Sequence, residues 1–294
     1  MEEPGLDADL TPKADLGEES YRGSGRLTGR KALITGGDSG IGAATAIAFA
    51  REGADVAISY LPQEEEDAQR IAGILKEAGV TVAQLPGDLR DPEYCRSLVA
   101  DTVSALGGID ILVNNGGKQI FQESLADLTD EQFDDTFKTN VYAMFWITKA
   151  ALPHLPAGAS IINTTSIQAY SPSETLVDYA STKATINTFT KALAQQLAPQ
   201  GIRVNAVAPA PSGRRCSRAT ASRRRRSRAS ARRPRSDAWA SPRSSRRHTC
   251  SSRRPSRATS PVRRSTSTAA CPRPDADERP RSRAPRSGGV PRRD

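Results

Sequence analysis

The chain has 294 residues, enough for one large α/β domain or two ordinary ones, and its formal net charge of +9 would by itself favour an anionic partner. That average hides two compositions: 26 arginines face five acids from Ala210 to the end, a balance of +21, while residues 1–209 hold 16 bases and 28 acids, a balance of −12. No apolar run is long enough to span a membrane, and Cys95 is the only cysteine before the arginine-rich part, so a transmembrane protein, a disulfide-stapled domain and a bound metal are not expected.

Three segments follow from composition. Residues 1–28 form a polar, acidic extension without the apolar core of a signal peptide, so we expect a cytoplasmic protein with no membrane partner. Residues 29–209 alternate apolar runs with amphipathic stretches and are long enough for a sizeable core. Residues 210–294 contain no Ile, Leu, Phe, Met or Tyr, so almost nothing offsets the entropy cost of ordering them. The sequence predicts one folded domain followed by a disordered Arg/Ser/Pro-rich tail.

The middle segment alternates strand and helix patterns, which predicts a single doubly wound parallel sheet of the Rossmann type. Helices on both faces and a ligand at the carboxyl ends of the strands are expected for this topology. In chain order we expect strand 31–35, helix 41–52, strand 56–59, helix 64–78, strand 81–85, helix 92–106, strand 111–114, a long helix 129–152 interrupted near Pro153, strand 160–163, helix 179–197 and strand 202–207.

A glycine-rich turn joins the first strand to the first helix and reads TGGDSGIG from Thr35 to Gly42. Glycine lets the backbone turn sharply and approach a pyrophosphate, whose charge is met by N–H groups at the helix N-terminus. A glycine triplet alone also occurs in ordinary tight turns, but its position in a βα unit favours nucleotide binding. The residues predicted to contact a dinucleotide here are Gly36, Asp38, Ser39, Gly40, Ile41 and Gly42.

Tyr179 and Lys183 lie four residues apart at the start of a predicted helix, so their side chains share one face. A phenol with an ordinary pKa of about 10 is a poor acid or base at neutral pH, and a neighbouring ammonium lowers that pKa by favouring the phenolate. The pair could therefore transfer a proton. The same spacing is, by itself, most often a surface pair on a helix.

Two further polar residues fall near the same edge of the predicted sheet. Ser166 follows a strand, which places its hydroxyl where a substrate carbonyl oxygen could accept a hydrogen bond, although it could equally be a turn serine. Thr164, Thr165 and Ser171 are rivals for that role. Asn140 falls inside a predicted helix, where a short amide is disfavoured unless it bonds the backbone or a water.

Taken together, the glycine turn, the NNGG turn at 114–117 and the set Asn140, Ser166, Tyr179 and Lys183 resemble the short-chain dehydrogenase/reductase family in order and spacing over residues 29–209. The leader and residues 59–62 further resemble a bacterial stress-associated branch of NADP-dependent aldehyde or sugar reductases. The resemblance implies an oxidoreductase that passes hydride between a nicotinamide and a small carbonyl or alcohol substrate.

The resemblance also implies a role for each matching residue. Tyr179 is the proton donor or acceptor, Lys183 lowers its pKa and positions the nicotinamide ribose, Ser166 polarises the carbonyl, and Asn140 holds a relay water. On the cofactor side, the family's pattern falls on Asp88 at the adenine amine, on Leu89 beside it, and on Asn114 at the nicotinamide ribose. A homotetramer is expected for the family.

The choice between NADP and NAD depends on the end of the second strand. An acid there would bond the ribose 2′-hydroxyl of NAD and repel the extra phosphate of NADP. Ser59 and Tyr60 occupy that place, so NADP is allowed, but the glycine turn carries Asp38 and no arginine. The sequence is compatible with either cofactor and leans slightly to NADP.

The family's pattern stops after Val207. Loss of one base in a G run at the Pro209 codon would change Pro-Gly-Pro-Ile-Trp into Pro-Ala-Pro-Ser-Gly, which is the sequence found at 209–213. The same offset lets residues 212–218, 238–242, 248–252 and 258–262 encode segments typical of the family's C-terminal region, so we predict a frameshift from Ala210. The alternative is a natural basic tail that binds nucleic acid, attached to a non-catalytic dinucleotide-binding fold.

A frameshift has physical consequences for this chain. The final strand would be missing, and an unpaired sheet edge promotes aggregation. The frameshift would also remove the loop that covers the substrate, so the sequence does not identify the substrate. It would remove the elements that build the family's tetramer as well, so we do not expect this chain to form one. We predict weak stability and impaired activity for this chain.

Overall fold

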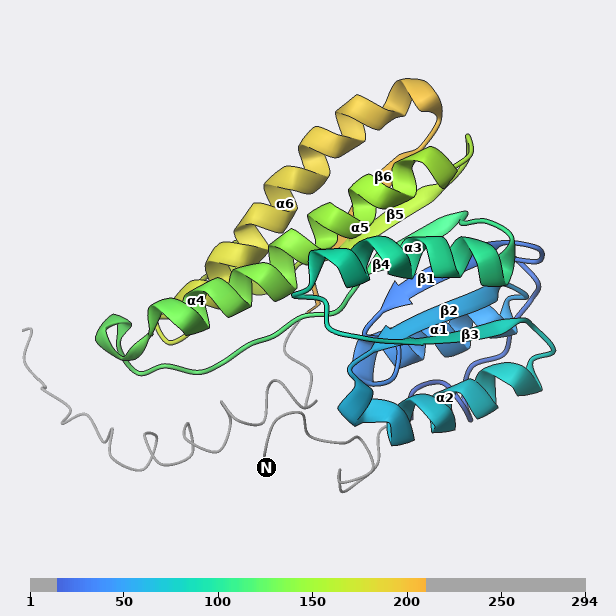
Figure 1. The fold of residues 1–294 in the computed structure, drawn as a ribbon, viewed down its shortest axis with the longest axis horizontal. Coiled ribbons are helices and arrows are strands. Elements are labelled where there is room, and N and C mark those ends of the chain that lie inside the picture. Colours follow the sequence, from blue (N-terminus) through green and yellow to red (C-terminus); the bar gives the residue numbers. More distant parts are fainter. Residues whose placement is uncertain (1–14, 210–294) are drawn as a thin grey trace, which may run out of the picture. The chain divides into compact units, whose positions relative to one another are not determined.

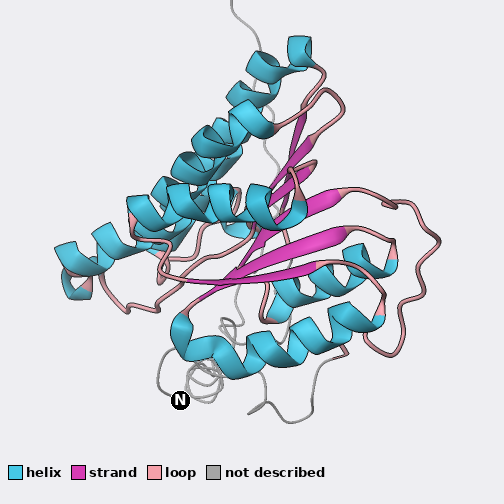
Figure 2. Cartoon of the chain, turned by 45° about the vertical axis from the view of Figure 1, so that its right-hand side comes forward, coloured by secondary structure: helices cyan, strands magenta, loops and turns pink. Residues whose placement is uncertain are grey.

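The computed structural model describes residues 15–209, whose centre is a six-stranded parallel sheet in the order β3-β2-β1-β4-β5-β6 (Figures 1 and 2). Every neighbouring pair runs parallel, as the alternating strand and helix pattern predicts. The strands are β1 (Lys31–Thr35), β2 (Asp55–Tyr60), β3 (Val82–Pro86), β4 (Ile111–Asn114), β5 (Ser160–Thr164) and β6 (Arg203–Val207). The Rossmann-type fold predicted for the middle segment is confirmed.

Helices cover the sheet on both faces (Figure 2). Leu33 and Leu112 face a core built with α3, α5 and α6, whereas Ile34 and Ile58 face a second core built with α1 and α2. Almost every residue of β1, β2 and β4 is buried, as expected for central parallel strands. The helices are α1 (Gly40–Arg51), α2 (Glu65–Glu77), α3 (Pro92–Leu106), α4 (Asp130–Phe137), α5 (Ala143–Ala151) and α6 (Val177–Leu197).

Helix α3 shows why several predicted boundaries are accurate. Asp91 precedes it with an extended backbone and accepts a hydrogen bond from the N–H of Glu93, and Pro92 occupies the first turn. Gly107 ends the helix in the left-handed conformation, with φ of 75°. Each of these signals is local in sequence, so the predicted bounds of 92–106 agree with the structure.

The expected helix over 129–152 is divided in the structure. The segment η4 (Lys138–Tyr142) is a π-helix between α4 and α5, and a 3-10 turn, Leu152–His154, follows α5. The predicted interruption near Pro153 is confirmed, but the π-helix was not predicted. It has no sequence signal such as proline or glycine, and it lies where Asn140 makes long-range contacts.

A buried polar network joins β4 and β5 to the helices behind them. The Asn114 Nδ2 donates to Asn163 Oδ1 at 2.8 Å and to Thr148 Oγ1 at 3.1 Å, and Asn163 Nδ2 donates to Thr190 Oγ1 at 2.9 Å. Buried amides require such partners because they have lost water. The network fixes α5 and α6 relative to the strand ends that border the site.

The part of the acidic extension that the structure describes packs against the end of α1. Leu16 is 5% exposed and joins the second core. Glu52 is buried and accepts hydrogen bonds from the Tyr21 hydroxyl, from the N–H of Ser24 and from Arg26, whose Nε lies 2.9 Å away. The Arg26 guanidinium, followed by the Tyr21 hydroxyl, holds the pKa of Glu52 far below its usual range.

Replacement of Glu52 by glutamine is expected to lower the Tm at neutral pH, because an amide cannot accept all of these hydrogen bonds. Since the folded-state pKa of Glu52 is depressed, its contribution is present above the unfolded value of about 4.5 and is lost as pH falls below it. The Tm difference between wild type and Glu52→Gln should therefore shrink on acidification. The exposed Glu77→Gln is the control in the same thermal melts, and equal Tm values for the two variants at neutral pH would contradict the assignment.

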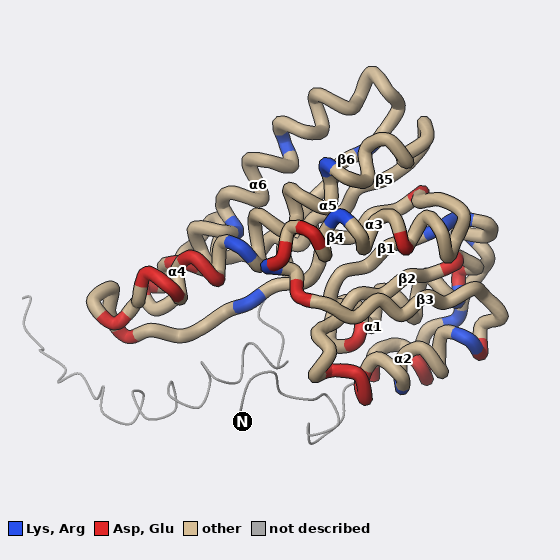
Figure 3. Tube along the Cα trace, in the orientation of Figure 1, with Lys and Arg blue, Asp and Glu red and all other residues tan. Residues whose placement is uncertain are grey.

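Strand β6 is the last strand of the sheet among residues 15–209, and Val207 at its end is 53% exposed. The predictions of a missing final strand, a disordered tail and a frameshift concern residues 210–294, outside the described residues. Within 15–209 no helix is both long and apolar enough to cross a membrane. Acidic residues are prominent along α2 and α4 (Figure 3), consistent with the negative balance found for the first 209 residues.

Candidate functional site

The glycine turn lies at the carboxyl edge of the sheet, between β1 and α1. Gly36 and Gly40 have φ of 61° and 53°, a conformation that residues with a side chain rarely adopt. Ser39 precedes α1 with an extended backbone, and the first turn of α1 carries no acidic side chain. This end of the helix therefore suits an anionic group.

Three glycines are also set by close packing against neighbouring protein atoms. A Cβ at Gly42 would lie 1.8 Å from the Gly36 carbonyl oxygen, so the turn closes only around glycine. A Cβ at Gly116 would lie 2.5 Å from Leu89 Cδ1, and one at Gly117 would lie 3.2 Å from Asn140 Oδ1. Close packing thus favours glycine both in the turn and beside the predicted catalytic residue Asn140.

Thr35 and Asn115 join the glycine turn to the NNGG turn, and neither was predicted as a site residue. Thr35 Oγ1 accepts hydrogen bonds from the N–H groups of Asn115 and Gly116, both at 2.9 Å. The Asn115 Nδ2 donates to the carbonyls of Thr35 and Gly36, each at 3.2 Å. Asn115 is part of the NNGG motif, so position in that motif was the available signal.

Tyr179 and Lys183 lie one turn apart near the start of α6, as the spacing predicts. The Lys183 ammonium is 5.4 Å from the centroid of the Tyr179 ring. Lys183 is 4% exposed and its Nζ donates to the Thr164 carbonyl at 2.8 Å, which ties α6 to the end of β5. The structure thus places a buried ammonium beside the half-buried ring of Tyr179.

Ser166 lies two residues beyond β5 and is buried. Its Oγ accepts a hydrogen bond from the N–H of Gln168 at 3.2 Å and caps the short 3-10 turn Ile167–Ala169. Ser166 is therefore a turn serine, as one of the two interpretations of the sequence predicted. Because its Oγ acts as an acceptor in this turn, its hydroxyl hydrogen can be donated to an oxygen in the site. The rival Thr165 is occupied, since its hydroxyl donates to the Lys183 carbonyl at 2.8 Å.

Asn140 sits in the π-helix η4 and is 2% exposed. Its Oδ1 accepts from the N–H of Lys118 at 2.7 Å, and its Nδ2 donates to the Lys118 carbonyl at 2.9 Å and to Thr182 Oγ1 at 3.1 Å. Of the two partners that the sequence left open for this amide, the backbone or a water, the structure shows the backbone. Through these bonds Asn140 connects the segment after the NNGG turn to α6. The expected contact of Asn140 with a relay water remains a prediction.

Ser59 and Tyr60 end β2 beside the glycine turn, and the N–H of Gly37 donates to the Ser59 carbonyl at 3.1 Å. Both side chains are buried, and the Tyr60 hydroxyl donates to Glu65 at 2.8 Å. Burial, followed by that hydrogen bond to Glu65, raises the pKa of Tyr60. Asp38 is also buried, at 1% exposure. The end of β2 beside the glycine turn therefore holds two carboxyl groups, of Asp38 and Glu65, next to the buried hydroxyls of Ser59 and Tyr60.

Asp88 and Leu89 follow β3, where the adenine end of a dinucleotide is expected. The Asp88 carboxylate accepts hydrogen bonds from Arg90, with Oδ2 2.7 Å from Nη2, and these hold the pKa of Asp88 below its usual value. Arg90 also reaches Asp135 on α4 at 2.9 Å. The adenine amine would therefore approach a carboxylate that already has an arginine partner.

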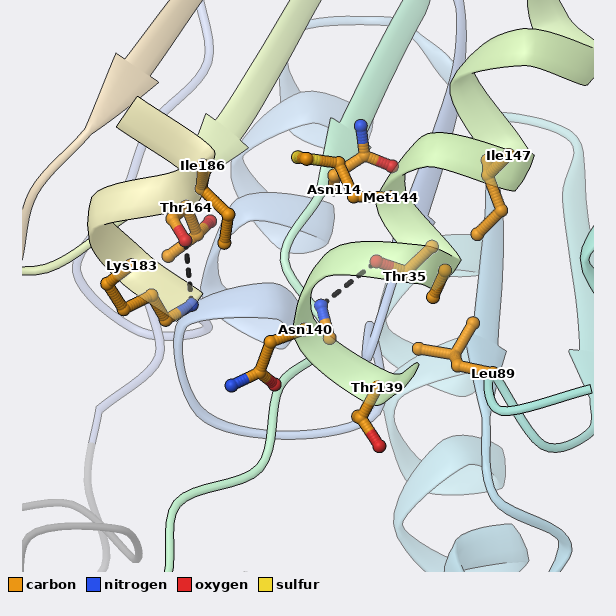
Figure 4. Close-up of a pocket in the computed structure, with 12 residues that line it drawn as sticks. Thr35, Leu89, Asn114, Thr139, Asn140, Met144, Ile147, Thr164, Lys183 and Ile186 are labelled. Carbon is orange, nitrogen blue, oxygen red and sulfur yellow. Dashed lines mark hydrogen bonds between the residues drawn. The ribbon is translucent and has the colours of Figure 1, made fainter. Parts of the chain in front are cut away.

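A small pocket lies at the edge where β1, β4 and β5 end (Figure 4). It brings together the predicted residues Asn140 and Lys183 beside the end of β4. The Asn114 side chain borders it, but its Nδ2 is used within the strand network described above. The lining includes Thr35, Leu89, Asn114, Asn140, Thr164 and Lys183.

Comparison with known proteins agrees with this geometry. Residues 30–223 match the family model for short chain dehydrogenase. The chain is 60% identical over 208 residues to the uncharacterized oxidoreductase YghA of Escherichia coli, covering 71% of each chain. It is 42% identical over 214 residues to the chloroplastic NADPH-dependent aldehyde reductase 1 of Arabidopsis thaliana, covering 71% of this chain and 74% of that one.

A solved structure of a short chain dehydrogenase from Burkholderia cenocepacia, in complex with NADP, has 38% sequence identity and a TM-score of 0.62. The match covers 67% of this chain and 83% of the other. Sequence, fold and site geometry thus agree. The chain belongs to the short-chain dehydrogenase family and is an NAD(P)-dependent oxidoreductase.

Proposed function

We propose that the protein interconverts a small aldehyde, ketone or sugar and the corresponding alcohol, with Asn140, Ser166, Tyr179 and Lys183 as its reactive set. One observation carries the proposal: the buried Lys183 ammonium lies 5.4 Å from the Tyr179 ring at the carboxyl edge of the sheet. Proton transfer at the Tyr179 hydroxyl is the chemistry that such a pair supports.

Each residue has a distinct task in this proposal. Ser166 donates its hydroxyl hydrogen to the substrate oxygen, and Tyr179 gives that oxygen a proton in reduction or takes one in oxidation. Lys183 favours the phenolate and contacts the ribose. Asn140 holds the Lys118 segment and α6 at a fixed separation through its three hydrogen bonds. A bound nicotinamide supplies or accepts the hydride.

For the cofactor we propose a nicotinamide dinucleotide, with NADP ahead of NAD. The glycine turn with α1 would hold the pyrophosphate, Asp88 and Leu89 the adenine, and Asn114 and Lys183 the nicotinamide ribose. The names of the Arabidopsis relative and of the Burkholderia structure, which mention NADPH and NADP, support this order. Asp38 and Glu65 lie near the end of β2, where acids disfavour the extra phosphate of NADP, so both cofactors should be measured side by side.

The first test compares two proteins: the 294-residue chain and a frame-restored chain, meaning the translation after one base is reinserted at the Pro209 codon. We expect the frame-restored chain to consume NADPH with aldehydes such as propanal, and the present chain to be less active with a lower Tm. NADPH and NADH binding is measured by fluorescence titration. If the frame-restored chain binds neither cofactor, the enzyme assignment is wrong.

The remaining expectations stay predictions. Resequencing across the Pro209 codon decides between a frameshift and a natural basic tail, and the nucleic-acid alternative concerns residues outside those described. Light scattering of the frame-restored chain measures whether the homotetramer forms. The three-segment division of the chain and the cytoplasmic location remain proposals that rest on composition and resemblance.

A further inference from the structure

Asp178 is a buried carboxylate that directly precedes Tyr179. It is 1% exposed, and its Oδ2 accepts hydrogen bonds from Thr136 Oγ1 at 2.8 Å and from Gln132 Nε2 at 3.2 Å. Its Oδ1 accepts from the backbone N–H of Tyr179 at 2.7 Å. A buried carboxylate is costly without such donors. Asp178 therefore links α4 to the backbone of the predicted proton donor.

The same contacts extend to the segment between β4 and α4. The Gln122 Nε2 donates to Gln132 Oε1 at 2.5 Å, and the Gln122 N–H donates to the Thr175 carbonyl at 3.1 Å. Gln132 thus accepts from this segment through Oε1 and donates to Asp178 through Nε2. Three parts of the chain that are distant in sequence meet at the start of α6.

Helices α4 and α6 lie side by side (Figure 1), and α6 is joined at two levels to α4 and to the π-helix η4 that follows it. Thr136 meets Asp178 at one level, and Asn140 meets Thr182 at the next. Thr136 and Asn140 are four residues apart on one side, and Asp178 and Thr182 are four apart on the other, so the two bonds are about one helical turn apart. Tyr179 and Lys183 each directly follow one of these α6 anchors.

We propose that Asp178 is a positioning residue that fixes the first turn of α6 against α4 and thereby holds the Tyr179 phenol in its working place. The proposal rests on the proposed function of Tyr179. Loss of the Asp178 contacts lets the first turn of α6 shift relative to Lys183, whose own place is fixed separately by Thr164. Displacement of the phenol from the ammonium weakens proton transfer and raises the pKa of the phenol.

Thr136→Val tests this in the 294-residue chain, because it removes the hydroxyl and keeps the shape. Thr102→Val is the matched control: Thr102 and Thr136 are both fully buried, both hydroxyls lie near a helical carbonyl four residues earlier, and only Thr136 also meets Asp178. We expect Thr136→Val, and Asp178→Asn with it, to lower kcat for propanal with NADPH by about 10- to 100-fold. Thr102→Val should retain the wild-type kcat at a comparable Tm.

The pH profile separates positioning from general stability. In alcohol oxidation Tyr179 must be deprotonated, so a raised pKa moves the acidic limb of kcat to higher pH in Thr136→Val and leaves it unmoved in Thr102→Val. Equal kcat values and unshifted profiles for the two valine variants would overturn the proposal.

A second readout needs no turnover. Hydrogen–deuterium exchange over 177–183 should speed up in Thr136→Val relative to Thr102→Val, because the first turn of α6 has lost an anchor. Equal exchange in the two variants contradicts the positioning role, whatever the activity. Absence of NADPH and NADH binding in the frame-restored chain would instead contradict the proposed function, so the two failures are distinguishable.

Discussion

Replacement of Tyr179 by phenylalanine is expected to lower kcat of the frame-restored chain by about 10²- to 10⁴-fold. The change removes one oxygen and keeps the ring against which the Lys183 ammonium lies. The loss should appear in kcat, with a much smaller change in the Kd for NADPH, because binding uses many other contacts. Steady-state rates with propanal and a fluorescence titration of NADPH measure the two quantities.

Tyr170→Phe is the matched control for that experiment. Tyr170 is 61% exposed and ends the short turn after Ser166, so it undergoes the same chemical change close to the site. Its variant should retain wild-type kcat. Full turnover in Tyr179→Phe would show that proton transfer occurs elsewhere and would refute the assigned chemistry.

Replacement of Gly42 by alanine is expected to weaken NADPH binding by about 10- to 100-fold, since relieving an overpacked contact costs ~1–3 kcal/mol. The added Cβ would lie 1.8 Å from the Gly36 carbonyl oxygen, and that oxygen belongs to backbone rather than to a flexible side chain. The turn must open, which moves its N–H groups away from the pyrophosphate. Fluorescence titration gives the Kd, and a thermal melt records the accompanying loss of Tm.

Gly73→Ala serves as the control, because Gly73 lies within α2, is exposed, and has open space where its Cβ would be. That substitution should leave the Kd unchanged and raise the Tm slightly, as alanine favours a helix over glycine. A Gly42→Ala chain that binds NADPH with the wild-type Kd would mean that the turn does not set the cofactor site.

Local signals account for most of the fold that the sequence predicted. The strand Ile111–Asn114 and the helix Pro92–Leu106 have the predicted bounds, since an apolar run, a cap and a glycine define them within a few residues. The split of the 129–152 helix was not predictable in this way. The π-helix coincides with the hydrogen bonds of Asn140 to Lys118 and Thr182, which are distant in sequence.

The site shows the same division. The family resemblance singled out Tyr179 and Lys183, and helical spacing predicted that they share one face, because four residues return a helix to the same face. Asp178 was missed because it directly precedes the predicted helix 179–197, where an acid is ordinary, and only packing against α4 shows that it is buried and bonded. Asn114 was assigned by resemblance to the ribose, and the structure adds an interior task that only the neighbouring Asn163 reveals.

The π-helical segment makes the site sensitive to the number of residues, besides their identity. A π-helical turn closes from residue i to i+5 and so holds one residue more than an α-helical turn. Excision of a single residue from Lys138–Tyr142 would therefore restore a regular helix in which Ala143, Ile147 and Ala151 still face the interior. Asn140, however, would lose the place from which it reaches Lys118 and Thr182. A deletion here would thus damage the site more than the fold.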